Sequence, residues 1–192
     1  MRIYIILTYT GTLLSKIIKK YTKAEFSHVS ISLDEELNKM YSFGRLNPYN
    51  PFIGGFVHEG INIGTFKRFK KTKAAVYSLN VTIEQYEKIE EMINEFEKNK
   101  DSYTFNIIGL FAAGFHKKIN KECSFYCAEF VKYILDNANI ELGLPEIIKP
   151  EDFKYIEKLK LTYEGKFRKY TTKHKYTLKE IIQLHQQKEA MM

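Results

Sequence analysis

The sequence predicts one domain of the α+β class, in which a small antiparallel sheet packs against helices. Hydrophobic residues make up 44% of the 192 residues, and Tyr and Phe supply the whole aromatic share of 15% because the chain has no Trp. This is enough apolar material to bury a single core. Two patterns favour the class: strict alternation of apolar and polar residues near position 30, and helical spacing of apolar residues near position 90.

The first elements are predicted by local patterns. Residues 2–9 (RIYIILTY) are rich in β-branched and aromatic residues, which favours a buried strand. In residues 11–23 the apolar side chains fall on one helical stripe with lysines opposite, as in a short amphipathic helix. Residues 26–33 (FSHVSISL) then alternate strictly, so that Val29 faces the core and His28 lies on the polar face.

A polar segment connects this strand to residues 40–45 (MYSFGR), and the two strands form a predicted hairpin. In the second strand Tyr41 and Phe43 share the core face, while Ser42 faces the other way. The register of this hairpin is predicted to bring Ser42 onto the same face as His28.

Turn residues and helix caps predict the next elements. Residues 47–56 contain two Asn-Pro steps and a Gly-Gly pair, which predict an ordered loop at the border of a site. Residues 70–81 predict another strand. Residues 82–100 predict a helix, because Thr82 and Gln85 have the spacing of a capping box.

The second half predicts two further helices and a basic tail. Residues 105–115 (FNIIGLFAAGF) predict a buried helix, because they are about half as long as the ~20 residues that cross a bilayer. A helix that contains a cysteine follows. We expect one domain over residues 1–163 and a basic C-terminal extension over residues 164–192, which ends in a helix and packs on the same domain.

The net charge of +7 favours contact with an anionic surface, such as membrane lipid or an acidic polymer. Lysines outnumber arginines, which argues against specific nucleic-acid recognition; dispersed solubilising lysines are the alternative. The start of the chain lacks the pattern of a secretory signal, so a cytoplasmic protein, at most peripheral to a membrane, is expected. No P-loop, C-x-x-C or H-E-x-x-H motif occurs, and neither a cofactor nor a metal is predicted.

The segment 124–135 (SFYCAEFVKYIL) places one of two cysteines near the start of a predicted helix. Cys127 shares the apolar face of that helix, so a buried core residue is one interpretation. Ser124 is the predicted N-cap, and Cys127 then lies in the first turn, where free backbone N–H groups and the helix dipole stabilise a thiolate or an oxyanion. A nucleophile is the other interpretation. Cys123 precedes the apolar periodicity and is the weaker candidate.

A nucleophilic cysteine requires a base, and the sequence contains five histidines. His28 is the strongest candidate, because it is the one on the polar face of a predicted strand. The others follow the glycine-rich loop or lie in lysine-rich turns and the terminal helix: His58, His116, His174 and His185.

Residues 27–45 (SHVSISLDEELNKMYSFGR), followed about 80 residues later by FYCAEFVKYIL, resemble the circularly permuted branch of the NlpC-type papain-like cysteine peptidase superfamily. The lecithin retinol acyltransferase-like enzymes belong to the same broad group. The resemblance implies a papain-like fold with the nucleophile Cys127 at a helix N-terminus, His28 as general base and Ser42 as the residue that orients the imidazole. Relatives more often carry His, Glu, Asn or Gln at the third position, so Glu59 or a backbone carbonyl is the alternative to Ser42.

The function implied is that of a cysteine-dependent hydrolase of the amidase or peptidase type. Its substrate is a peptide, an amide or an acyl ester, and an acyl-enzyme forms on the cysteine. Two alternatives remain open: a lipid-directed acyltransferase or thioesterase that uses the same Cys and His, and an inactive module that binds an anionic partner through its basic surface.

Overall fold

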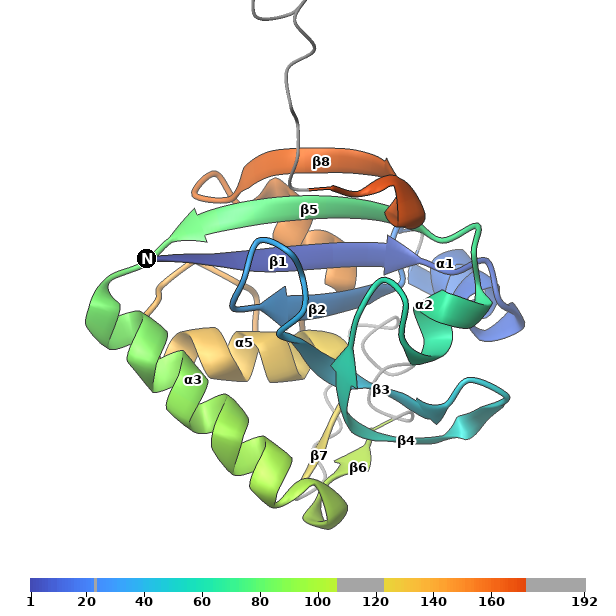
Figure 1. The fold of residues 1–192 in the computed structure, drawn as a ribbon, viewed down its shortest axis with the longest axis horizontal. Helices are drawn as coiled ribbons and strands as arrows, with labels where there is room; N and C mark the ends of the chain where they lie inside the picture. Colours follow the sequence, from blue (N-terminus) through green and yellow to red (C-terminus); the bar gives the residue numbers. More distant parts are fainter. Residues whose placement is uncertain (23, 107–122, 172–192) are drawn as a thin grey trace, which may run out of the picture.

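The computed structural model describes residues 1–22, 24–106 and 123–171. The fold is α+β and consists of a six-stranded antiparallel sheet with helices packed around it (Figure 1). The strand order is β4-β3-β2-β1-β5-β8, and β6 and β7 form a separate parallel pair. The predicted class and the antiparallel sheet are therefore confirmed.

The strands of the large sheet are β1 (Arg2–Tyr9), β2 (His28–Ser32), β3 (Met40–Asn47), β4 (Asn50–Glu59), β5 (Lys73–Asn80) and β8 (Lys160–Lys166). The small pair consists of β6 (Thr104–Phe105) and β7 (Ser124–Phe125). The α-helices are α1 (Leu13–Thr22), α2 (Gly64–Arg68), α3 (Ile83–Lys98) and α5 (Cys127–Asn137). Three short 3₁₀ turns are η1 (Lys100–Ser102), η2 (Pro150–Tyr155) and η3 (Phe167–Lys169).

Helix α3 begins where the capping box predicts. The Thr82 hydroxyl accepts a hydrogen bond from the Gln85 backbone N–H at 3.1 Å, and the Gln85 side chain accepts one from the Thr82 N–H at 3.0 Å. Two of the N–H groups that every helix leaves unpaired at its start are satisfied in this way.

Residues 47–56 do not form the predicted loop. The turn is confined to the residues around Pro48, and β4 pairs with β3 up to Met40↔Glu59. Gly54 belongs in this strand because a side chain does not fit there: a Cβ would lie 2.7 Å from the Gly44 carbonyl oxygen and 2.8 Å from the Cβ of Phe105. The glycine therefore permits close approach between strands and does not mark a turn.

Both faces of the sheet are buried. Val29 and Ile31 face the main core, as predicted, together with α3 and α5. The opposite face carries His28 but is not simply polar, because Phe66 of α2 and Phe167 of η3 close a second, smaller core over Met40. The sheet is thus sandwiched between two apolar layers, and polar side chains on its second face are shielded from water.

The ladder between β2 and β3 is short. It consists of the pairs Ile31↔Tyr41 and Ser32↔Met40, whereas β1 pairs with β2 along the whole strand as far as Thr8↔His28. His28 therefore lies where β2 is held by β1 on one side and β3 no longer pairs on the other. This opening is the place where side chains from the two faces of the sheet can meet.

The boundary expected at residue 163 falls inside β8, which pairs with β5 on both sides of that position. Phe167 is buried beyond it, so the packed domain continues past residue 163. The predicted terminal helix, most of the predicted helix over 105–115, and His116, His174 and His185 lie outside the described residues. Within the described part of the chain, no helix has the length and apolarity that a membrane span requires.

Phe43 is predicted to be the most costly aromatic residue to remove from the core. It is fully buried, and within the described ranges five other aromatic rings have centroids 5.2–6.2 Å from its own. Phe43→Ala should lower the free energy of unfolding by about 3–5 kcal/mol, through lost burial and the cavity that remains. Urea denaturation measures the change. Tyr155→Ala, at a side chain that is 73% exposed, is the control and should cost less than about 0.5 kcal/mol; equal losses in both variants would contradict the packing described.

Candidate active site

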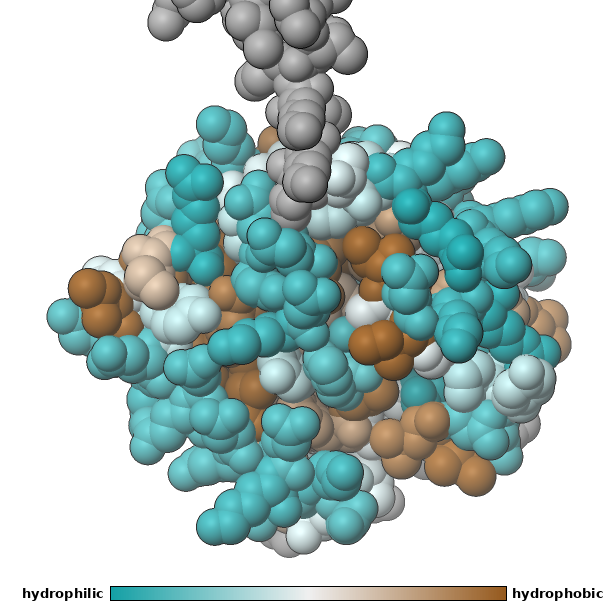
Figure 2. Space-filling model, in the orientation of Figure 1, coloured by the Kyte–Doolittle hydropathy of each residue, from teal (hydrophilic) through white to brown (hydrophobic). Residues whose placement is uncertain are grey.

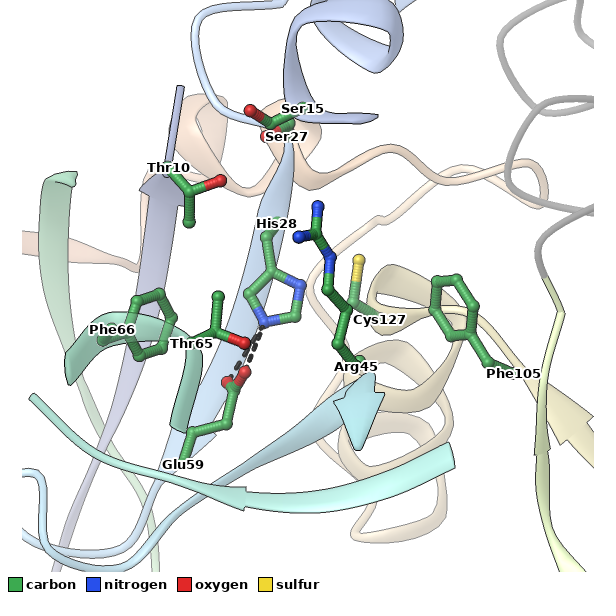
Figure 3. Close-up of a pocket in the computed structure, with 11 residues that line it drawn as sticks. Thr10, Ser15, Ser27, His28, Arg45, Glu59, Thr65, Phe66, Phe105 and Cys127 are labelled. Atoms are coloured by element: carbon green, nitrogen blue, oxygen red, sulfur yellow. Dashed lines mark hydrogen bonds and ion pairs between the residues drawn. The ribbon is translucent and has the colours of Figure 1, made fainter. Parts of the chain in front are cut away.

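Cys127 and His28 line one cavity, at the end of the sheet where β1 ends and β2 begins (Figure 3). Its volume is ≈ 60 Å³, far below the several hundred Å³ of a pocket that encloses a whole ligand. The space fits the reacting part of a substrate. The lining residues are Thr10, Ser15, Ser27, His28, Gly44, Arg45, Glu59, Thr65, Phe66, Phe105 and Cys127.

Cys127 is the first residue of α5, as its predicted place in the first helical turn requires. The predicted cap is wrong: Tyr126 is the N-cap, because Ser124 lies in β7 and takes part in the small sheet. The Glu129 carboxylate accepts the Tyr126 N–H at 3.1 Å, and the Tyr126 hydroxyl donates to the Ile148 carbonyl at 2.8 Å. These bonds fix the start of the helix, and the first turn of an α-helix leaves N–H groups without a partner inside the helix.

Cys127 is only 1% exposed and also contacts the main core. The two interpretations of the sequence are therefore compatible in structure, because the side chain sits at the junction of the core and the cavity. Cys123 is exposed and does not line the cavity.

The His28 imidazole lies between a carboxylate and the thiol. Its Nε2–H donates to Glu59, at 3.0 Å from Oε1 and 3.1 Å from Oε2. The other side of the ring is turned toward Cys127 (Figure 3). The Glu59 carboxylate thus fixes the orientation of the ring, and the second ring nitrogen is left on the side of Cys127.

The charge on His28 is set by opposing effects. Burial lowers the pKa of His28, but the Glu59 charge, the neighbouring Cys127 thiol and the hydrogen bond that His28 donates to Glu59 raise it, and the result is a pKa of about 10. The imidazole therefore holds its proton at neutral pH.

Glu59 is held in place by a second hydrogen bond. The Ser30 hydroxyl donates to Glu59 Oε2 at 2.6 Å and lies 3.4 Å from His28 Nε2. Ser30 was not identified from the sequence, although it lies two residues after His28 on the same strand face. That spacing alone would have indicated it.

Ser42 does not contact His28, contrary to its predicted place beside the imidazole. Its hydroxyl donates to the Val29 carbonyl at 2.7 Å, beyond the last ladder pair between β2 and β3. Continuing the register of that ladder puts Ser42 level with Ser30, and the residue level with His28 is Gly44. A Cβ at Gly44 would lie 3.4 Å from the His28 ring, so the glycine leaves room for it. Glu59, the alternative considered with Ser42, accepts the hydrogen bond from the imidazole.

His58, another candidate from the sequence, does not line the cavity. His58 Nε2 donates to the Asn38 carbonyl at 2.6 Å on the exposed surface. In the described ranges, no group of three His, Cys, Asp or Glu side chains is arranged to hold a metal ion. Arg45, which sequence reasoning missed, lines the cavity and donates from Nη2 to the Thr12 hydroxyl at 2.8 Å.

Comparison of the chain with protein-family models, with curated proteins and with solved structures finds no match. The function must therefore be inferred from the geometry and chemistry of the cavity.

Glu59→Gln is predicted to lower the pKa of His28. The carboxylate favours the imidazolium, and a neutral amide leaves burial, which favours the neutral ring. An NMR titration of the His28 ring nitrogens measures the shift. Ser42→Ala is the matched control: it should leave that pKa unchanged but cost about 1–3 kcal/mol of stability, because the buried Val29 carbonyl loses its donor.

The same substitution has a linked effect on stability. A pKa that is raised on folding contributes stability that is complete below the unfolded value near 6.5 and is lost as the pH rises through the folded value of about 10. In a shared Cys127→Ser background, which removes the titration of the thiol, the stability advantage of the parent over E59Q should shrink from pH 6.5 upward. An advantage that stays constant with pH would show that Glu59 does not act on the His28 proton.

Proposed function

We propose that this chain is a cysteine-dependent hydrolase of the amidase or peptidase type. The observation that carries the proposal is the placement of the His28 ring between the Glu59 carboxylate and Cys127 at the first residue of α5. In this proposal Cys127 is the nucleophile, His28 transfers protons and Glu59 orients the imidazole.

The reaction begins from a thiolate and an imidazolium. Cys127 Sγ attacks the carbonyl carbon, and the negative charge that develops on the carbonyl oxygen is stabilised by free N–H groups of the first turn of α5. His28 gives its proton to the leaving amine or alcohol as the bond to the carbonyl carbon breaks, which leaves an acyl-enzyme. Water then attacks the thioester while His28 accepts its proton, and the carbon–sulfur bond breaks to restore the thiolate.

The finer fold assignment, a permuted papain-like domain of the NlpC type, is part of the same proposal. Three observations support it: β2 with His28 precedes the cysteine helix in the chain, α5 packs on the sheet that contains β2, and residues 27–45 resemble the family motif. Fold-level resemblance does not identify the substrate, which depends on the cavity.

The lipid-directed alternative is favoured by the surface next to the cavity. Leu46, Tyr49 and Ile53 of the β3–β4 hairpin are all more than half exposed, and apolar surface gathers over this hairpin in Figure 2. Exposed apolar side chains beside basic residues suit an anionic lipid interface. An acyltransferase or thioesterase would use the same Cys127 and His28, with a lipid hydroxyl or amine or water as the acceptor.

Alkylation of Cys127 by iodoacetamide tests for the thiolate. An ordinary thiol with a pKa near 8.5 reacts roughly 150-fold more slowly at pH 6 than at pH 8.5, because the thiolate fraction falls. We expect Cys127 to slow by less than about tenfold over this range, and the His28→Gln variant to regain the steep dependence. Peptide mass spectrometry measures the extent of alkylation at both cysteines in the same sample, so the exposed Cys123 serves as the internal reference. A steep dependence at Cys127 in the parent protein would contradict the proposal.

Acyl-enzyme formation tests the reaction itself. With an activated ester such as p-nitrophenyl acetate, intact-protein mass spectrometry should detect one acyl group on the parent protein and none on Cys127→Ser. His28→Gln should slow the acylation by about 10²–10⁴-fold, the usual contribution of acid–base catalysis. Cys123→Ser is the matched control and should be acylated at the parental rate. Acylation that persists in Cys127→Ser would refute the assignment of the nucleophile.

A further inference from the structure

Arg45 carries a positive charge into the cavity without a carboxylate against it. Its Nη2 donates to the Thr12 hydroxyl at 2.8 Å, and its guanidinium lies 6.0 Å from the centre of the Phe69 ring. Among the residues that the structure describes, no Asp or Glu forms an ion pair with it. Glu59, the carboxylate that lines the cavity, is already bound by His28 and Ser30.

The environment of Arg45 increases the cost of its charge. Arg68 stacks on Tyr49, with its Cζ 3.7 Å from the ring centre, and lies 5.2 Å from the centre of the Phe69 ring that Arg45 also approaches. Burial and the like charge of Arg68 both lower the pKa of Arg45. A half-buried cation that faces another cation is unfavourable unless an anion joins them.

Hydroxyl groups lie beyond the guanidinium, on the side away from Glu59 (Figure 3). Figure 3 shows the guanidinium directed toward Ser15 and Ser27, opposite the carboxylate. The Ser27 side chain lines the cavity, belongs to a residue that is only 6% exposed, and its hydroxyl has no hydrogen-bond partner within the described ranges. Thr12 is itself occupied, by Thr10 at 3.2 Å and by Ser15 at 3.3 Å. Arg45 and Ser27 therefore have donors left for a ligand.

We propose that Arg45 and Ser27 form an anion subsite that binds a carboxylate of the substrate, close to the carbonyl that Cys127 attacks. The planar guanidinium matches the two oxygens of a carboxylate, and a cavity of ≈ 60 Å³ admits little more than that group and the scissile carbonyl. The substrate class is an amide or ester with a free carboxylate a few bonds from the scissile bond, as at the C-terminal peptide bond of a short peptide. This inference rests on the proposed role of Cys127.

The test compares two alkylating reagents that differ in this group alone. Iodoacetate and iodoacetamide transfer the same two-carbon unit to a thiol, but iodoacetate carries a carboxylate where iodoacetamide carries an amide. We expect the ratio of their rates at Cys127, iodoacetate over iodoacetamide, to fall at least about tenfold in Arg45→Gln, the effect of losing a charge-assisted hydrogen bond. Arg68→Gln removes a neighbouring charge that does not line the cavity, and its ratio should stay within about twofold of the parent.

Two outcomes would overturn the subsite. One is an unchanged ratio in Arg45→Gln, which includes an equal slowing of both reagents and would then mean that Arg45 acts on the thiol. The other is an equal fall of the ratio in Arg68→Gln, which would indicate a general effect of positive charge. If Cys127 reacts with neither reagent, the proposed function fails, and the subsite is then decided by the NMR signal of the Arg45 Nε–H during titration with acetate. A saturable shift in the parent that is absent with acetamide supports the subsite, and no shift overturns it.

Discussion

The early end of the β2–β3 ladder is the constraint on which the cavity depends. Two residue pairs hold these strands together, and beyond them the Ser42 hydroxyl, not a backbone N–H, satisfies the Val29 carbonyl. Because the strands separate there, the imidazole of His28 can reach Cys127, whose helix packs on the other face of the sheet. A ladder continued to His28 and Gly44 would close this passage.

The cavity also depends on two buried charges, those of His28 and Glu59, which compensate each other. Removing a carboxylate and an imidazolium from water is costly, and the pair is tolerated when its geometry and its additional hydrogen bonds are good. Here the two Glu59 oxygens accept hydrogen bonds from His28 Nε2 at 3.0 and 3.1 Å, and the Ser30 hydroxyl donates to one of them at 2.6 Å. The second apolar core, closed by Phe66, excludes water from this face and so strengthens these interactions.

Arg45 differs from this group because its charge has no counterpart in the described residues. In a folded protein such a charge costs stability, and sites of ligand recognition are where that cost is commonly found. The cavity is therefore lined by one compensated pair, His28 with Glu59, and by one cation, Arg45, without a carboxylate partner in the described residues. In the proposed function, the pair would transfer protons while Arg45 would bind a charge of the substrate.

The sequence by itself determined the features that depend on neighbours within about four residues. Alternation placed Val29 and His28 on opposite faces, the spacing of Thr82 and Gln85 located the start of α3, and the apolar periodicity after Cys127 placed that residue at a helix start. Each of these follows from the 2.0 or 3.6 residue period of a strand or helix, or from a hydrogen bond made within one turn.

Only the tertiary structure decided which distant residues complete the cavity. Glu59 and Arg45 come from strands whose register depends on where a ladder ends, and the end of a ladder has no local signature. The same holds for β4: its glycines are typical of a turn, yet Gly54 is required by the approach of Gly44 and Phe105 from other parts of the chain. Tyr126, not Ser124, caps α5, because Ser124 belongs to β7 and pairs with β6. This pairing is a long-range contact that the local sequence pattern of a helix start does not contain.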